Sequence, residues 1–98
     1  MEVKKRDGRI VPFNKQKIID AIMAAFRSVG DTHLEYAQTK AENIANYIKD
    51  YAEEKNIILE IEEIQDLVEK GLMSLKRKDV AKAYILYREQ RSRERNRN

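Results

Sequence analysis

Basic side chains are concentrated at the start of the sequence, around a single Asp7-Gly8 pair. The first seventeen residues contain six of them: Lys4, Lys5, Arg6, Arg9, Lys15 and Lys17. Ammonium and guanidinium groups that converge from several segments can bind a polyanion. This concentration therefore indicates an anion-binding site, provided that the fold positions the side chains together.

The net charge of +3 is distributed unevenly along the 98 residues. Residues 1–17 carry +4, residues 88–98 carry +3, and the long segment between them carries −4. If the fold brings the two basic ends together, they form a local anion site. If it separates them, they are two solvated surfaces. The architecture decides between these possibilities.

The composition excludes several classes of protein. The chain has no cysteine, which rules out a disulfide scaffold, a thiolate nucleophile, a zinc ribbon and iron-sulfur ligation. It also lacks a phosphate-binding loop of the GxxxxGK type and an apolar run of the roughly 18 residues that a membrane span needs. We therefore expect a small cytoplasmic domain that is not catalytic alone and has no metal site.

The basic segment "EVKKRDGRIVP" is typical of a β-hairpin. Asp7-Gly8 predicts a two-residue type I′ turn, because that turn needs positive φ at both central residues. Pro12 cannot donate to a ladder and so closes the second strand. Asn14 then stands where the N-cap of a helix over about residues 15–28 is expected.

Three further helices and one short strand are expected after Gly30, which ends the first helix. Thr32 and Glu35 form a capping-box pattern that predicts the start of the second helix. The β-branched run "IILEI" predicts a third strand, followed by an apolar helical stripe. Asp79 is a candidate N-cap for the last helix.

The expected fold is mainly α (α+β), with four helices capped by a small antiparallel β-hairpin or three-stranded sheet. One domain is expected over residues 1–91. Residues 92–98 have no apolar side chain to bury, so we expect a disordered basic tail or the start of a linker.

Three segments give the chain a specific resemblance. The run "VKKRDGRIVPFNKQKI", then "EEIQDLVEKGL" and "VAKAYILYREQR", resembles the ATP-cone, a nucleotide-binding regulatory module at the N-terminus of many ribonucleotide reductases. The segments "VPF" and "KAYILYREQR" are most similar to those of the anaerobic ribonucleoside-triphosphate reductases. A triphosphate carries about four negative charges, which fits a site that draws cations from both ends of the chain.

The resemblance implies a set of nucleotide-binding residues. Side chains of the hairpin and of the last helix would bind phosphates, a glycine would form the turn, and residues at the start of the first helix would bind the base and sugar. The full set is Lys5, Arg6, Gly8, Asn14, Lys17, Ile18, Gln65, Arg88 and Arg91. Val3 and Ile10 are implied as further apolar walls. Gln65 and Ile61 stand where some members have His and Thr, and Val11 stands where some have Glu.

The resemblance also implies the biological role. ATP or dATP, with or without Mg²⁺, would be the allosteric effector, and the partner would be the catalytic domain of the same reductase. ATP would permit deoxyribonucleotide synthesis and dATP would suppress it, with a nucleotide-dependent oligomer as the expected assembly. No nucleic acid or membrane partner is expected.

Two alternatives come from other classes of protein. The basic ends and the net charge of +3 are also compatible with a fragment of a nucleic-acid-binding transcriptional regulator of ATP-cone type. A plain helical interaction module would use the same charges for solubility. Individually, Lys4, Arg9 and Lys15 are expected to be solvated surface, Asn14 is compatible with a cap alone, and Tyr84 and Tyr87 are expected to be core residues.

Overall fold

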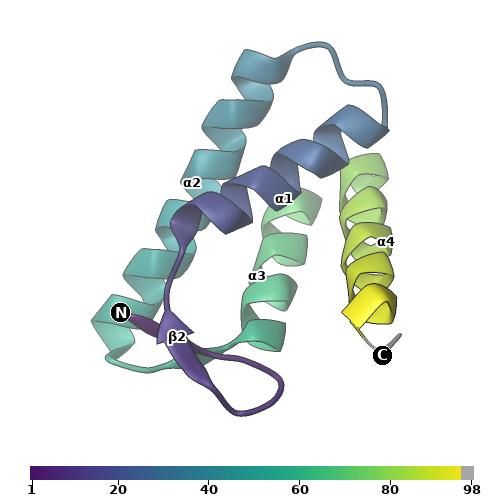
Figure 1. Ribbon diagram of the computed structural model, residues 1–98. Coiled ribbons are helices and arrows are strands. Elements are labelled where there is room, and N and C mark those ends of the chain that lie inside the picture. The colour runs from purple at the N-terminus through teal and green to yellow at the C-terminus, as the bar shows by residue number, and fades with distance from the viewer. Residues whose placement is uncertain (96–98) are drawn as a thin grey trace.

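The computed structural model describes residues 1–95, and these form a mainly helical fold with a small sheet at one end (Figure 1). The elements in chain order are β1 (Glu2–Lys4), β2 (Ile10–Pro12), α1 (Lys15–Ser28), α2 (Leu34–Lys55), β3 (Leu59–Glu60), α3 (Ile61–Ser74) and α4 (Lys78–Arg95). The expected fold class is confirmed.

Helix α1 is the central packing element of the fold. It crosses the other helices diagonally, packing against both α2 and α4, while α3 contacts α4 and, less extensively, α2 (Figure 1). Its inner face contributes Ile22 and Phe26, which are fully buried. They pack with Ile48 of α2, Val68 of α3 and Val80 of α4 into one core. The four helices therefore hold the sheet at a fixed end of the domain.

The sheet has three strands in the order β2-β1-β3. β1 pairs antiparallel with β2 and parallel with β3. The expected third strand is confirmed, but it makes the sheet mixed, because the chain returns from α2 in the direction of β1. Val3 and Leu59 are paired in register and buried against the helices, so the sheet is anchored to the core by alternate side chains.

The hairpin turn differs from the expected type I′ turn. The Gly8 N–H donates to the Lys5 carbonyl at 2.9 Å, and the Lys5 N–H donates to the Arg9 carbonyl at 2.8 Å. Gly8 has a φ of 90°, whereas Asp7 is not among the residues with positive φ. This is a three-residue loop of the type I plus bulge kind. The Asp7 side chain explains the change, because it accepts hydrogen bonds from the Arg9 N–H and Nε.

The boundaries of α1 agree with the sequence expectation. The Asn14 side chain accepts a hydrogen bond from the Lys17 N–H at 3.3 Å, as an N-cap does. Gly30 lies just beyond the helix with a φ of 79°, a conformation that favours glycine.

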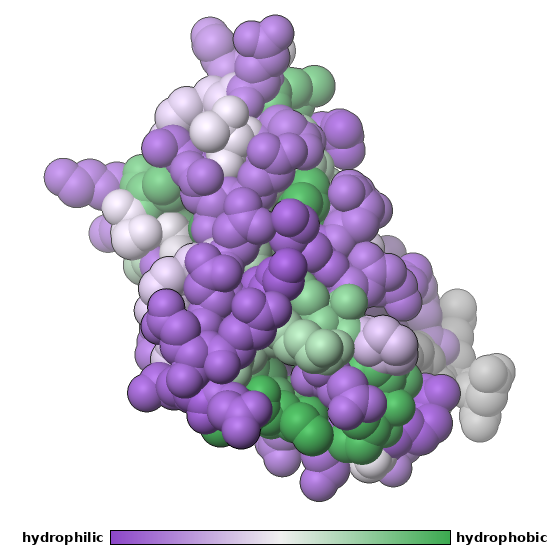
Figure 2. Space-filling model, turned by 90° about the vertical axis from the view of Figure 1, so that its left-hand side faces the viewer, coloured by the Kyte–Doolittle hydropathy of each residue, from purple (hydrophilic) through white to green (hydrophobic). Residues whose placement is uncertain are grey.

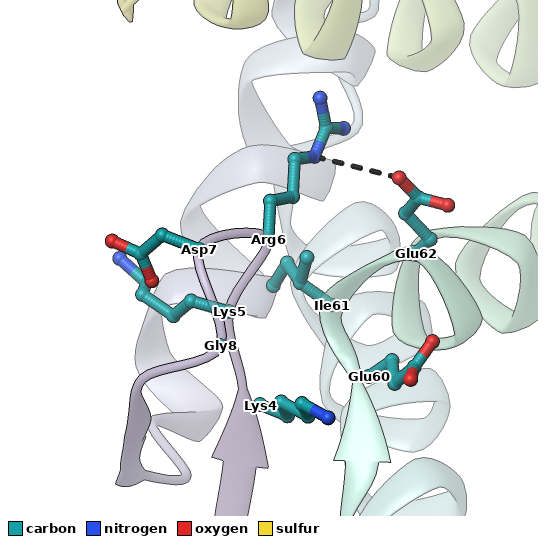
Figure 3. Close-up of a pocket in the computed structure, with 8 residues that line it drawn as sticks. All are labelled: Lys4, Lys5, Arg6, Asp7, Gly8, Glu60, Ile61 and Glu62. Atoms are coloured by element: carbon teal, nitrogen blue, oxygen red, sulfur yellow. Dashed lines mark ion pairs between the residues drawn. The ribbon is translucent and has the colours of Figure 1, made fainter.

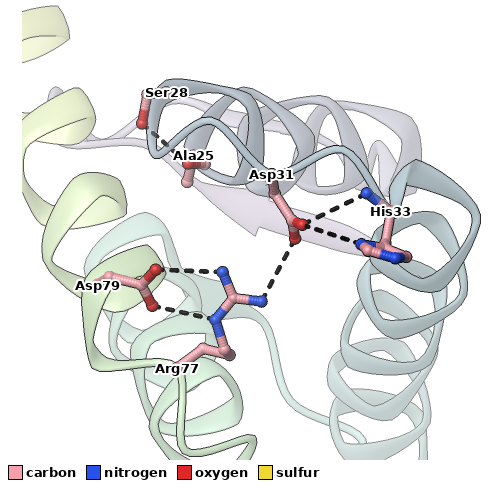
Figure 4. A network of polar contacts seen from close by, with 6 residues as sticks. All are labelled: Ala25, Ser28, Asp31, His33, Arg77 and Asp79. Atoms are coloured by element: carbon pink, nitrogen blue, oxygen red, sulfur yellow. Dashed lines mark hydrogen bonds and ion pairs between the residues drawn. The ribbon is translucent and has the colours of Figure 1, made fainter.

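The predicted starts of α2 and α4 were wrong. α2 begins at Leu34 after His33, which makes no side-chain capping bond, so Thr32 does not start a capping box. α4 begins at Lys78, which places Asp79 inside its first turn. Arg77 connects the two helix starts, because its guanidinium donates to Asp31 at 3.3 Å and to Asp79 at 3.1 Å (Figure 4).

The α3-α4 turn is held to α1 by the same arginine. The Arg77 guanidinium carbon lies 5.5 Å from the centre of the Phe26 ring. Hydrogen bonds from Arg77 hold the pKa of the Asp79 carboxyl below its ordinary value, and the Asp79 carboxylate raises the pKa of Arg77. The start of α4 is therefore fixed relative to the core.

Helix α4 continues past the expected end of the domain at residue 91. It runs to Arg95, so residues 92–95, which were expected to belong to a disordered tail or the start of a linker, are helical. Residues 96–98 of that expected tail lie outside the described residues. The extension matters because Ser92, which was assigned to the tail, contacts the hairpin.

Candidate functional site

The hairpin tip borders a cavity of about 430 Å³ (Figure 3). Its lining comes from β1, the turn, β3 and the first residues of α3, and consists of Lys4, Lys5, Arg6, Asp7, Gly8, Glu60, Ile61 and Glu62. Three of the predicted site residues, Lys5, Arg6 and Gly8, are therefore neighbours here. Basic and acidic side chains border the same space, which suits a charged ligand more than an apolar one.

Arg6 connects the hairpin to both of the last two helices. Its Nη1 donates to Ser92 Oγ of α4 at 2.9 Å, and its Nη2 donates to Gln65 Oε1 of α3 at 3.3 Å. Its Nε lies 3.8 Å from Glu62 Oε1 of α3. The two ends of the chain thus meet at Arg6, and two of the predicted site residues, Arg6 and Gln65, are in direct contact.

Arg88 lies about one helical turn before Ser92 on α4 and also contacts α3. Its Nη1 pairs with Glu69 and lies 3.5 Å from Asp66. Arg91 instead forms an exposed pair with Glu94 of its own helix at 3.7 Å. The seam between α3 and α4 therefore contains Arg6 and Arg88, whereas Arg91 lies on the solvent side.

The predicted residues of α1 occupy a separate position. Asn14 caps the helix, Lys17 is exposed, and Ile18 is half-buried against the core. They are not among the residues that line the cavity at the hairpin tip. In Figure 3, Lys5 extends toward the side of Asp7, away from Glu62, whereas Arg6 extends toward Glu62. The structure thus gathers Arg6, Gln65 and the α3-α4 seam, but not all nine predicted residues, around one point.

Two pKa shifts describe the electrostatics near this site. Hydrogen bonds from the Arg9 backbone and side chain hold the pKa of Asp7 below its ordinary value, so the turn carboxylate stays ionised. Burial raises the pKa of the Tyr84 hydroxyl, which keeps this core residue neutral. Tyr87 is only partly covered, with 36% of its surface exposed. Tyr84 is therefore the core residue of the expected pair.

Four residues that contact Arg6 or Arg88 were not predicted from the sequence to belong to the site: the acidic residues Glu62, Asp66 and Glu69, and Ser92. Glu62, Asp66 and Glu69 are spaced four and three residues apart, which places them on one face of α3. That face meets Arg6 and Arg88. The spacing was visible in the sequence, but it had no meaning until the opposite basic partners were located.

The face of the molecule on the α2 side is mostly hydrophilic (Figure 2). Apolar side chains gather near its lower end, which is the end where the sheet lies. The exposed large apolar residues next to the strands are Met1, Ile10, Ile57 and Ile58. Within residues 1–95, no three His, Cys, Asp or Glu side chains are grouped closely enough to hold a metal ion. None of the helices over the same residues combines the length and apolar character that crossing a membrane requires.

Comparison with known proteins gives a match over nearly the whole chain. The model of the ATP cone domain family matches residues 1–93. The chain is 44% identical over 95 residues to the vitamin B12-dependent ribonucleoside-diphosphate reductase of Thermoplasma acidophilum, covering 92% of this chain and 12% of that protein. It is 38% identical over 89 residues to the anaerobic ribonucleoside-triphosphate reductase of Salmonella typhimurium, covering 91% of this chain and 12% of that protein.

A third relative belongs to another kind of reductase. The ribonucleoside-diphosphate reductase subunit alpha of Chlamydia trachomatis is 37% identical over 100 residues, covering 95% of this chain and 10% of that protein. The chain therefore spans only about a tenth of the length of these relatives. Because they include three kinds of reductase, the resemblance to the anaerobic kind stays a prediction. The family itself is established: this chain belongs to the ATP-cone family.

Proposed function

We propose that this chain is the allosteric nucleotide-binding domain of a ribonucleotide reductase, with ATP or dATP as its effector. The observation that carries the proposal is the position of Arg6, which joins the hairpin to Gln65 of α3 and Ser92 of α4. A guanidinium held where three elements meet can bind phosphate oxygens in a fixed direction. Any ligand that it binds can also change how those elements contact one another.

The phosphate end of the nucleotide is assigned to the basic residues at this junction. Lys5 and Arg6 would bind phosphate oxygens from the hairpin, and Arg88 and Arg91 would approach them from α4. Arg88 already lies in the α3-α4 seam through Glu69 and Asp66, and it would exchange a carboxylate for a phosphate when the nucleotide binds. Mg²⁺ would accompany the phosphates and reduce their mutual repulsion.

The base and sugar are assigned to the start of α1. Asn14 presents an amide, Lys17 a flexible cation and Ile18 a half-buried apolar surface. These groups supply a hydrogen-bonding edge and an apolar wall, which a base requires. Gln65 would contact the nucleotide from the opposite side.

The domain would not be catalytic by itself. It would transmit the identity of its nucleotide to the catalytic domain of the same cytoplasmic reductase, with ATP permitting and dATP suppressing deoxyribonucleotide synthesis, through a nucleotide-dependent oligomer. The relatives support this place in a longer chain. Each is named as a reductase, and the match covers about a tenth of the relative's length.

Isothermal titration calorimetry of the 98-residue chain with ATP and with duplex DNA, at physiological salt, tests the proposal. We expect micromolar ATP binding and no comparable DNA binding. Lys5→Ala should weaken ATP binding about tenfold or more, as expected for a charged hydrogen bond. Lys82→Ala, which removes an exposed cation of α4, is the matched control and should have little effect. DNA binding with a steep salt dependence would favour the nucleic-acid-binding alternative instead, and binding of neither would leave the interaction module.

A further inference from the structure

All three nitrogen atoms of the Arg6 guanidinium face partners within the protein. Nη1 donates to Ser92, Nη2 donates to Gln65, and Nε faces the Glu62 carboxylate at 3.8 Å. A guanidinium binds an oxyanion in a bidentate way through two adjacent N–H groups along one edge of its planar fork. A guanidinium has five N–H groups, and one of its two bidentate edges combines the Nε–H with an Nη–H. Because the Glu62 carboxylate faces Nε, a phosphate that binds Arg6 through this edge must displace Glu62.

Glu62 is the charged partner in this set, and the same helical face repeats the arrangement. Asp66 and Glu69 follow Glu62 by four and seven residues and pair with Arg88. Both arginines proposed to approach the phosphates in the seam are thus paired with carboxylates of α3. In each pair the carboxylate presents to the guanidinium the same kind of anionic oxygen that a phosphate would present.

We propose that Glu62 is an internal competitor of the phosphate chain and sets the affinity of the site for polyphosphates. This inference rests on the proposed function. In the protein alone, Glu62 holds Arg6 beside α3. When a polyphosphate binds, Arg6 exchanges the carboxylate for phosphate oxygens, and Glu62 turns toward solvent, to which 64% of its side chain is already exposed.

Competition by Glu62 should affect the binding of some ligands and not of others. The need to break the Arg6-Glu62 pair disfavours a ligand that binds Arg6 through its Nε edge and leaves unaffected any ligand that does not reach Arg6. Glu62→Gln removes the charge while keeping the shape of the side chain, so it removes the competition for the Arg6 guanidinium. An exposed ion pair is weak, so the expected gain in affinity is about two- to fivefold.

Calorimetric titration of the full 98-residue chain tests the inference with ATP, inorganic tripolyphosphate and adenosine as the probes. We expect Glu62→Gln to bind ATP and tripolyphosphate about two- to fivefold more tightly than the wild type and to bind adenosine equally well. Glu89→Gln is the matched control, because it removes the same charge from an exposed site on α4. In an Arg6→Ala background, Glu62→Gln should give no gain, because the competition acts through Arg6.

Each other outcome is decisive. Wild-type protein that is folded by circular dichroism but does not bind ATP would overturn the proposed function and this inference with it. Normal ATP binding by the wild type, with no gain in Glu62→Gln, would overturn the inference and leave the proposed function intact. An equal gain in Glu89→Gln, or a gain that persists without Arg6, would overturn it as well, because the effect would then come from net charge.

Discussion

Arg6 donates a hydrogen bond to Ser92 at 2.9 Å, although the two residues are 86 positions apart in the sequence. This contact brings the two basic ends of the chain together. The composition alone did not decide whether they are close in space or separated. The contact places Arg6 of the first basic segment beside the last helix, so a guanidinium from one end of the chain and the seam at the other end face the same ligand-accessible surface.

Nucleotide binding should stabilise the fold. Because the proposed site draws on the hairpin, α1, α3 and α4, unfolding destroys it, and ATP at a hundredfold excess over its dissociation constant should raise the free energy of unfolding by about 2.7 kcal/mol. Chemical denaturation with and without ATP measures this, and GTP or CTP at the same concentration should stabilise less. A denaturation midpoint that millimolar ATP leaves unchanged would contradict the proposed function.

Gly8→Val should impair binding more than it impairs folding. Gly8 has a φ of 90°, and a Cβ added there would meet no atom within 4 Å, so the cost of a side chain is conformational and amounts to about 1–2 kcal/mol. The turn would shift and displace Lys5 and Arg6 from their positions. Gly30→Val is the matched control, because Gly30 has a φ of 79° and equally open surroundings but lies at the end of α1. Both variants should lose similar stability, and only Gly8→Val should lose ATP affinity in a calorimetric titration.

The pair of Arg77 and Asp79 should make stability depend on pH in acid. Hydrogen bonds from Arg77 hold the pKa of Asp79 below its ordinary value of 3.8. A lowered pKa means that this stabilisation is fully present above about pH 4 and is lost as the pH falls through the lowered value. Urea unfolding from about pH 7 to about pH 2 should therefore show a wild-type advantage over Asp79→Asn that shrinks below about pH 4. Asp50→Asn, at an exposed site on α2, is the control for the change of charge itself.

Features decided by neighbouring residues could be predicted from the sequence, and features decided by distant partners could not. Asn14 and Gly30 bound α1 as expected because capping and positive φ are properties of a few adjacent residues. Thr32 does not cap α2, and the loop that contains it is held at Asp31 by the distant Arg77, a contact that no local pattern reveals. The seam residue Ser92 was assigned to a tail for the same reason, since its partner Arg6 is at the other end of the chain.

In the candidate site, too, contacts between distant residues could not be predicted from the sequence. Arg6 and Gln65 were each expected in the site from the family resemblance, but their contact was not predicted, because no local signal in either segment specifies it. Glu62 looked like an ordinary solvated residue, because an exposed acidic side chain on a helix has no distinguishing mark until its partner is known. Electrostatic pairing across elements is therefore the part of this site that requires the fold.

The two basic ends should act on the same phosphates, and a double-mutant cycle tests this directly. Arg6→Ala and Arg91→Ala should each weaken ATP binding about tenfold or more, because a charged hydrogen bond contributes on the order of 1.5 to 3 kcal/mol. If both side chains bind one phosphate chain, the double variant should depart from additivity, since the loss of one contact lets the ligand shift relative to the other. Each loss should be smaller for AMP, which lacks the distal phosphates.

Arg93→Ala provides the control for this cycle, because Arg93 is exposed on the same helix and carries the same charge. Its removal should change ATP binding only slightly and in a way that salt suppresses, as expected for a screened, long-range interaction. Equal losses from Arg91→Ala and Arg93→Ala, with no preference for ATP over AMP, would mean that α4 contributes a diffuse positive potential. The assignment of Arg91 of α4 to the specific phosphate site would then be wrong. The role of Arg6 would be decided separately by the Arg6→Ala variant.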